Sequence, residues 1–149
     1  MTGIQHIGLF VTDLRAAEAY YQPLFKMQLI GREAQLDDGL WYTLPFDKGW
    51  DDAKTAGIEP GMLALRKGEF VLALFQGEAP QGRVFAIGLY MPEVEIANLR
   101  TRLPADVALL EAGAVSLAFR DSYQITWQIS APGKGFRTAG DFVNRWIQL

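Results

Sequence analysis

The sequence predicts an α+β fold made of two tandem modules, each with the element order β-α-β-β-β. Three observations lead to this fold class. The apolar run Ile4–Val11 recurs 80 positions later as Val84–Met91, with Ile-Gly-Leu and an aromatic residue at matching places. A helix signal follows each copy, and three more strand-like runs follow each helix signal. We expect one domain of 149 residues, divided into a module at 1–79, a module at 82–131 and a C-terminal extension at 132–149.

The first module begins with a strand at Ile4–Val11, which is short, apolar and rich in β-forming residues. Thr12 and Asp13 are candidates for the N-cap of the helix that follows. Apolar residues at helical spacing predict that helix, which Pro23 should interrupt near its end: Leu14, Ala17, Tyr21 and Leu24. The remaining strands are predicted at Gln28–Gln35, Met62–Arg66 and Glu69–Gln76, with a tight turn at Lys67-Gly68.

The second module repeats this order. Its first strand is Val84–Met91, and Pro92-Glu93 is typical of a helix start. Ile96, Leu99 and Leu103 have the spacing of one helix face. Three strands are then predicted at Val107–Glu111, Ala114–Arg120 and Tyr123–Ser130, with a turn at Ala112-Gly113. Gly77–Gly82 is the predicted hinge between the modules.

Two segments have no counterpart in the repeat. Leu36–Gly61 is long for a connection, and it is rich in aromatic residues: Trp41, Tyr42, Phe46 and Trp50. This segment is either a lid over a binding site or an extra strand at Leu40–Phe46 whose rings enter the core. Gly135–Leu149 is expected to form a short packing helix, capped by Thr138 or Asp141, with Phe142 and Trp146 on one face.

Composition excludes several classes of function. The absence of cysteine rules out disulfides and Cys-type zinc sites, and the single histidine, His6, rules out a two-histidine iron site within one subunit. With 14 basic and 17 acidic residues and no basic stripe, nucleic acid is not an expected partner. No apolar run approaches the roughly 20 residues that cross a bilayer, and no signal peptide is visible. We expect a cytoplasmic homodimer without a membrane partner.

Two parts of the chain carry a family resemblance. The opening Ile4–Leu9, with Val11–Leu14, Tyr20-Tyr21 and Leu24-Phe25, resembles the first strand and helix of the vicinal oxygen chelate superfamily. Arg120-Asp121 with Trp127–Ile129 is similar to its last strand. This superfamily includes glyoxalase I, extradiol dioxygenases, and fosfomycin and bleomycin resistance proteins. The resemblance implies the glyoxalase/bleomycin resistance/dioxygenase fold, in which two modules curl a mixed sheet around a cleft.

The resemblance also implies four metal-ligand positions, in the first and last strand of each module, but this chain has a degenerate set of donors there. The positions fall on His6, Ala73, Ala86 and Gln128, with Thr126 in place of Gln128 if the register slips. Catalytic zinc normally has three protein ligands, whereas His6 and Gln128 offer two and no negative charge. We therefore expect no cofactor. A divalent metal is the alternative if a carboxylate compensates, although Glu33, Glu69 and Glu111 do not align with a ligand position.

The predicted cleft is suited to a small-molecule ligand. Its predicted lining residues are His6, Phe10, Phe75, Tyr90, Gln128, Trp41 and Trp50. Aromatic rings favour a small, largely apolar or aromatic molecule, which this protein would sequester, by analogy with the bleomycin resistance proteins. The alternatives are a lyase, isomerase or dioxygenase that uses a metal or His6 as a catalytic residue, and a scaffold without activity. His6 is either a functional group of the cleft or a core histidine bonded to a backbone carbonyl.

Overall fold

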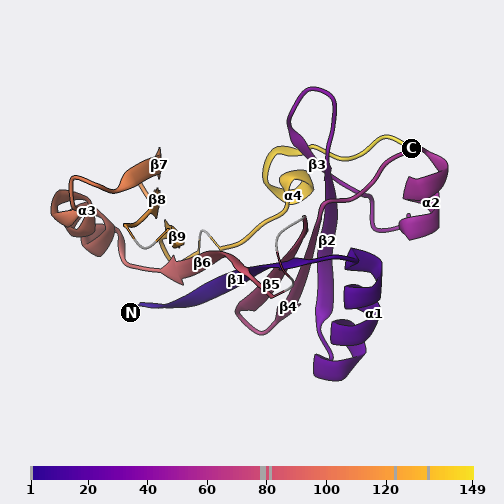
Figure 1. Ribbon diagram of the computed structural model, residues 1–149, viewed down its shortest axis with the longest axis horizontal. Coiled ribbons are helices and arrows are strands. Elements are labelled where there is room, and N and C mark those ends of the chain that lie inside the picture. The colour runs from indigo at the N-terminus through magenta and orange to yellow at the C-terminus, as the bar shows by residue number, and fades with distance from the viewer. Residues whose placement is uncertain (1, 78–79, 81, 123, 134) are drawn as a thin grey trace.

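The computed structural model describes residues 2–77, 80, 82–122, 124–133 and 135–149 (Figure 1). Within these residues, nine strands form one mixed sheet in the order β3-β2-β4-β5-β1-β6-β9-β8-β7. The strands are β1 (Gly3–Val11), β2 (Gln28–Gln35), β3 (Trp41–Thr43), β4 (Met62–Lys67), β5 (Phe70–Gln76), β6 (Val84–Tyr90), β7 (Ala108–Ala112), β8 (Ser116–Arg120) and β9 (Thr126–Ser130). The helices are α1 (Leu14–Phe25), α2 (Trp50–Thr55), α3 (Glu93–Arg102) and α4 (Ala139–Val143).

The predicted α+β fold of two β-α-β-β-β modules is confirmed. The first strand of each module pairs in parallel with the last strand of the same module, β1 with β5 and β6 with β9. The remaining strands of each module add in antiparallel fashion. The two modules then join edge to edge, because β1 pairs with β6 in antiparallel fashion. One continuous sheet therefore runs through both halves of the chain.

The junction of the modules has a local two-fold axis. Ile7 pairs with Ile87, and the partners on either side are exchanged around that pair. The register shifts twice, and the residues left without a partner are Gln5 on β1 and Phe85 on β6. These two β-bulges are themselves 80 positions apart in the sequence. The structure thus reproduces the 80-residue offset of the repeat in its backbone irregularities as well as in its strands.

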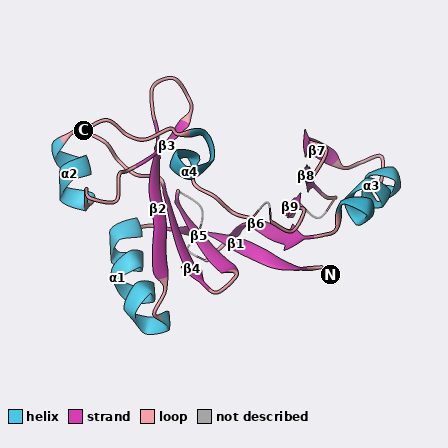
Figure 2. Ribbon diagram, turned by 180° about the vertical axis from the view of Figure 1, so that it is seen from behind, coloured by secondary structure: helices cyan, strands magenta, loops and turns pink. Residues whose placement is uncertain are grey.

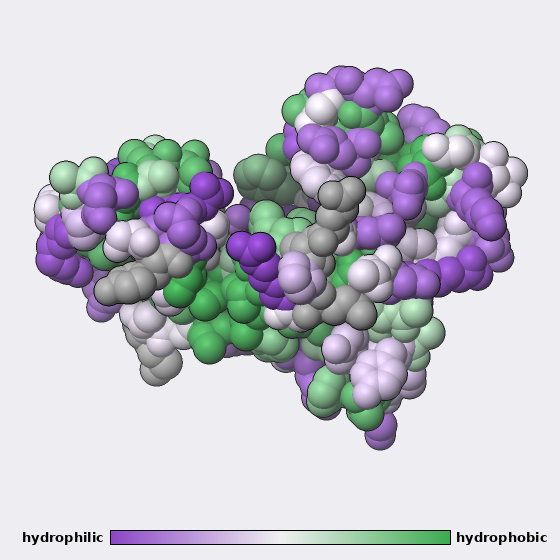
Figure 3. Space-filling view, viewed as in Figure 1, coloured by the Kyte–Doolittle hydropathy of each residue, from purple (hydrophilic) through white to green (hydrophobic). Residues whose placement is uncertain are grey.

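Both module helices lie on one face of the sheet. α1 packs on β4 and β5, and α3 packs on β8 and β9 (Figure 2). The middle of the sheet, where β1 and β6 meet, is left without a helix. Hydrophobic side chains gather over this region between the two lobes of the molecule (Figure 3).

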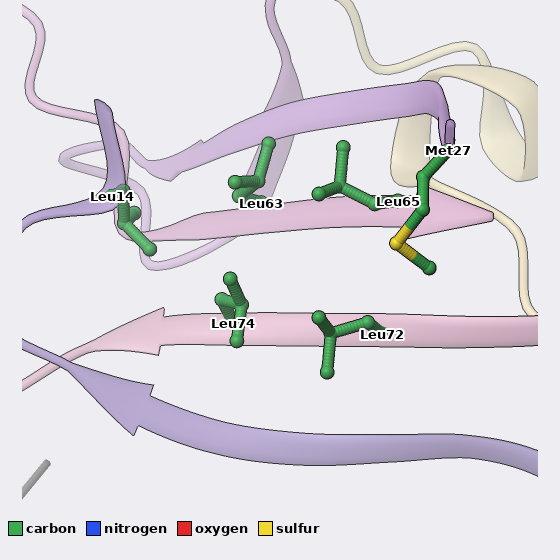
Figure 4. Packing of buried hydrophobic residues seen from close by; sticks show 6 residues of the cluster. All are labelled: Leu14, Met27, Leu63, Leu65, Leu72 and Leu74. Carbon is green, nitrogen blue, oxygen red and sulfur yellow. The ribbon is translucent and has the colours of Figure 1, made fainter. Parts of the chain in front are cut away.

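The module cores form between these helices and their strands. In the first module, leucines that alternate along β4 and β5 pack under α1: Leu63, Leu65, Leu72 and Leu74, with Leu14 and Met27 (Figure 4). In the second, Ile96 of α3 packs on Leu117, Phe119 and Ile129. Each fully buried leucine or isoleucine contributes about 1.5–3 kcal/mol relative to its exposed state. Alternation along these strands leaves the next residues, such as Ala64 and Ala73, on the opposite face, where the site lies.

The segment Leu36–Gly61 is part of the first module's packing. It contains the extra strand that was one of its two predicted forms, shortened to β3 at Trp41–Thr43, and also the helix α2. Leu44 and Ala53 are buried in a cluster with Ala34 and Ile147. The segment is therefore anchored by apolar residues that pack against β2 and the C-terminal extension, as the extra-strand form of the prediction requires.

The C-terminal extension returns to the first module. Thr138 is the cap of α4, since its hydroxyl accepts a hydrogen bond from the Asp141 amide. The Ala139 amide donates to the Glu33 carboxylate, and the Gly140 amide donates to the Thr43 hydroxyl at 2.7 Å. The predicted helix is thus present at Ala139–Val143.

Its two aromatic residues do not share a packed face. α4 ends before Trp146, which contacts Gly140 and Phe46, and the side chain of Phe142 is 64% exposed.

Smaller differences concern the ends of elements. β9 begins at Thr126 rather than at residue 123, because the Asp121 amide donates to the Ile125 carbonyl and closes a turn. α1 continues through Pro23 to Phe25, and Lys26 ends it in a left-handed conformation (φ 52°). Residues 78, 79 and 81 of the predicted hinge, and residue 123, lie outside the described residues. In the described part of the chain, no helix is long and apolar enough to span a membrane.

Glu33 makes the docking of the extension dependent on pH. Burial raises the pKa of Glu33 above its ordinary value of 4.5, and the hydrogen bonds from Ala139 and Thr43 oppose this. The folded protein therefore holds this proton more tightly than the unfolded chain does. The stability that protonated Glu33 contributes is complete below pH 4.5, and it is lost as the pH rises through the folded-state pKa of Glu33.

Urea unfolding of the wild type and of Glu33→Gln at pH 4.5 and 7.5 tests this effect. The wild type should lose stability relative to the variant as the pH rises, by about 1.4 kcal/mol for each pH unit between the two pKa values. A variant that is instead destabilised more at pH 7.5 than at pH 4.5 would mean that the ionised carboxylate holds the extension.

Candidate functional site

His6 lies in a row of residues that crosses the junction of the modules. Its partner on β6 is Gly88, and the partner of Gly88 on β9 is Gln128. The imidazole reaches across Gly88, so that its Nε2 lies 2.7 Å from Oε1 of Gln128. A Cβ added at Gly88 would lie 2.1 Å from His6 Nδ1. The ring can take this position only because residue 88 is glycine.

The bulge at Gln5 supplies the second partner of His6. A β-bulge re-aims the side chain of the inserted residue, and here Gln5 Oε1 lies 2.7 Å from His6 Nδ1. His6 is only 4% exposed, and this burial lowers its pKa below the ordinary 6.5, while the hydrogen bond with Gln128 acts in the opposite direction. The imidazole is therefore neutral at pH 7. Its partners are two side-chain amides rather than a backbone carbonyl.

A neutral imidazole has one donor and one acceptor nitrogen, so one of the two amides must present its NH2 group to the ring. The Gln5 amide nitrogen is buried and has no hydrogen-bond partner among the described residues. Turned toward Nδ1, that NH2 group donates to the ring, and His6 Nε2–H then donates to Gln128. Both ring nitrogens are satisfied in this arrangement.

The four positions where the fold family places metal ligands do not suit a divalent ion. His6 and Gln128 lie on one side of the two-fold axis, and Ala73 and Ala86, both fully buried, lie on the other side, flanking Gly8. The four positions thus supply two possible ligands, one imidazole and one neutral amide, and the two alanine methyl groups supply none. In the part of the chain that the structure describes, no cluster of three or more His, Asp or Glu residues could hold a metal ion.

The three glutamates that could act as replacement donors are engaged elsewhere or exposed in the part of the chain that the structure describes. Glu33 binds the Ala139 amide in the first module, Glu111 accepts a hydrogen bond from the Ser116 hydroxyl, and Glu69 is exposed beside a turn.

A hollow of about 370 Å³ opens beside His6 and Gln128. The sheet of the second module forms one side of it with Ser116, Gln128 and Ser130, which alternate with the core residues Leu117 and Ile129. The C-terminal extension forms the other side with Phe136 and Phe142. The Phe136 ring lies 5.0 Å from the His6 ring, edge to face. Figure 3 shows the molecule hollowed between the lobe that carries β7–β9 and the lobe that carries α4. Glu111 and Arg137 are its charged residues.

The other predicted cleft residues are distributed around this hollow. Phe10 and Phe75 pack on Phe85, with ring centroids 5.5 Å and 4.3 Å apart, and neither lines the hollow. Trp41 packs against the cluster of Met62, Ala64 and Val71, and it does not line the hollow. Tyr90 lines a second hollow, which adjoins the first along Gly135–Arg137.

Trp50 does not belong to this face of the sheet. It packs against the cluster of Leu14 under α1, and the Arg32 guanidinium lies 5.2 Å from its ring centroid. Arg32 is also paired with Glu18 of α1 through two contacts of 2.8 Å. Trp50 thus joins α2 to the helix-bearing face, which corrects its predicted place beside His6.

Sequence reasoning missed Gln5, Phe136 and Arg137 as site residues. Strict period-two alternation places Gln5 on the helix-bearing face, and no local signal marks the bulge that turns it. Phe136 and Arg137 belong to the extension, which was expected only to pack. Phe85 lies 80 residues after Gln5 and is the second bulged residue. This offset could have indicated the bulge at Gln5, but only once the strand register was known.

Comparison with known proteins identifies the fold. No family model and no curated protein matches the sequence. A hypothetical protein from Bacillus halodurans C-125 superposes with a TM-score of 0.52 at 15% identity, covering 92% of this chain and 99% of that one. A methylmalonyl-CoA epimerase in complex with methylmalonyl-CoA and NH4+ superposes with a TM-score of 0.52 at 16% identity, over the same shares.

A single-residue variant of Streptomyces coelicolor methylmalonyl-CoA epimerase, in complex with 2-nitronate-propionyl-CoA, gives a TM-score of 0.51 at 16% identity, covering 91% of this chain and 97% of that one. Identities this low show a shared fold and nothing finer. The chain therefore shares the fold of these epimerases, in agreement with the glyoxalase/bleomycin resistance/dioxygenase fold that the sequence resemblance implied.

Proposed function

We propose that this protein binds a small, largely apolar or aromatic molecule in the hollow beside His6, without a catalytic metal. The observation that carries the proposal is the set of contacts of His6. Both ring nitrogens are held at 2.7 Å by neutral amides, at the floor of a hollow whose apolar side is formed by Phe136 and Phe142. Such a hollow buries an apolar body and offers a few polar groups that orient it, as small-molecule sites do.

The same contacts favour binding over the alternative of a lyase, isomerase or dioxygenase. A general base needs a ring nitrogen that faces the substrate, whereas the two nitrogens of His6 face Gln5 and Gln128. A metal-dependent reaction needs donors that Ala73 and Ala86 do not have. Sequestration requires neither of these features, and the geometry therefore supports it best.

Binding of the fluorescent probe 1-naphthol tests the proposal. We expect saturable binding of one probe per chain, unchanged by EDTA. Ser116→Trp should abolish it, because Ser116 lines the hollow on the face of the sheet that carries Gln128 and the indole would fill that space. Val94→Trp is the matched control, since Val94 is 67% exposed on α3 and its substitution should leave binding unchanged.

Metal analysis supplies the contrary outcome. Near-stoichiometric zinc, nickel, manganese or iron in the purified protein, lost in His6→Ala, would overturn the metal-free proposal.

The passage of the imidazole across Gly88 gives a second prediction. Gly88→Ala should destabilise the protein by about 1–3 kcal/mol, because the new methyl group occupies the place of the ring. It should also weaken 1-naphthol binding. Gly3→Ala in the same strand pair is the control, since an added Cβ there meets nothing within 4 Å. In a His6→Ala background, Gly88→Ala should lower the free energy of unfolding much less, because the ring is absent. Urea unfolding measures both effects, and an equal loss of stability in the two backgrounds would contradict this geometry.

We also propose that the protein is a homodimer. The helix-bearing face leaves the middle of β1 and β6 uncovered (Figure 3), and matched apolar pairs from the two modules meet there: Ile4 with Leu89, Ile7 with Ile87, and Leu9 with Val84. Ile4 is 55% and Val84 47% exposed, and a second copy would remove this surface from water.

Light scattering of the purified chain tests this state. We expect a dimer for the wild type and a monomer for the double variant Ile4→Asp/Val84→Asp. A wild-type monomer at high micromolar concentration would reject the dimer.

A further inference from the structure

We infer that the ligand of this site carries an anionic oxygen group, a carboxylate or a phosphate monoester, which Arg66 and Arg137 bind near the Tyr90 hydroxyl. The inference rests on the proposed function and specifies the chemical class of the ligand. Its apolar body lies in the hollow beside His6, and its anionic group lies in the adjoining hollow.

The adjoining hollow has a volume of about 530 Å³ and is bounded by Arg66, Tyr90 and the segment Gly135–Arg137. That segment also bounds the hollow beside His6, and Arg137 lines both. The Tyr90 hydroxyl lies against Gly135, where an added Cβ would come within 2.7 Å of it. One guanidinium thus serves both spaces, and a single ligand that extends past Arg137 can occupy both.

The strand register places Arg66 close to His6. Arg66 on β4 pairs with Val71 on β5, and Val71 pairs with His6 on β1. Side chains in register share one face of a sheet, and two strand spacings amount to roughly 10 Å. The Arg66 guanidinium is fixed on this face because Nη2 donates to the Phe136 carbonyl at 3.1 Å. Its charge is therefore held within the reach of one small molecule from His6.

The two guanidinium groups lack the carboxylate partners that Arg15 and Arg32 have, although Arg137 lies 5.0 Å from the Phe142 ring centroid. Arg66 Nε is buried without a hydrogen-bond partner among the described residues. In the same part of the chain, no carboxylate oxygen lies within 4.0 Å of Arg66 or Arg137, whereas Arg15 is paired with Asp51 and Arg32 with Glu18. A buried donor without a partner costs about 1–3 kcal/mol. An anionic oxygen at this place would satisfy it by a charge-assisted hydrogen bond.

The local charge also favours an anion. Glu69 is the carboxylate that lines the adjoining hollow, and it is exposed beside the β4–β5 turn. Its single negative charge stands against the two positive charges of Arg66 and Arg137. In the hollow beside His6, Glu111 already accepts a hydrogen bond from Ser116. The net positive charge therefore lies on the side of Arg66.

Three probes that share one ring system test the inference: 1-naphthol, 1-naphthoate and 1-naphthyl phosphate. At pH 7.5, the preferred anion should bind at least tenfold more tightly than 1-naphthol, and the comparison of the two anions identifies the oxygen group that the site prefers. Arg137→Gln should reduce binding of that anion at least tenfold and reduce 1-naphthol binding much less. Arg66→Gln should weaken both probes, because Arg66 also holds the Phe136 carbonyl, and the loss should be at least tenfold larger for the anion. Arg102→Gln, at the end of α3, is the matched control. Arg137 is exposed, so its variant should fold even if Arg66→Gln does not.

Two results would overturn the inference, and they are distinguishable. If 1-naphthol binds as tightly as both anions, or if Arg137→Gln weakens all three probes equally, the arginines do not select an anion and the proposed function still stands. If none of the three probes binds, the proposed function fails and the inference fails with it.

Discussion

The antiparallel pairing of β1 with β6 is the constraint on which the rest of this structure depends. It sets Ile7 against Ile87 and so brings positions 80 residues apart into equivalent places around one junction. A shift of the register by a single residue would turn His6 to the helix-bearing face and break the row that it forms with Gly88 and Gln128. The strand register therefore decides whether the side chains of the site meet at all.

The same two-fold axis explains why the site is one-sided. The axis relates the bulged residue Gln5 to the bulged residue Phe85. It also relates His6 to Ala86, and Gln128 to Ala73. One side is thus polar and open to a hollow, while the other is closed by Phe85 against Phe10 and Phe75. An ion at the axis needs donors from both sides, and here only one side has them. The side without donors is part of the core, since Ala73 and Ala86 are fully buried.

The sequence predicted the elements with a repeated pattern and missed those that depend on long-range packing. Both modules follow from alternation and from the 80-residue offset. The neighbourhood of His6 and Gln128 and the two alanines at ligand positions follow from the family resemblance. Trp50 was misplaced because an aromatic residue in a loop carries no sign of the face it packs on, and only its contact with Arg32 and the α1 cluster decides that. Gln5 was missed because a bulge defeats period-two reasoning.

The C-terminal extension turns an open sheet into a hollow, and its attachment ties ligand binding to the state of the fold. Glu33 and Thr43 hold the start of α4, and Arg66 holds the Phe136 carbonyl from the other side of the same segment. Phe136 in turn covers His6. If Arg66 binds the anionic group of the ligand, one side chain positions both the wall of the site and its occupant. A ligand that binds more tightly when the extension is docked would stabilise the docked extension by that difference in binding free energy. Release of the extension would weaken binding by the same amount.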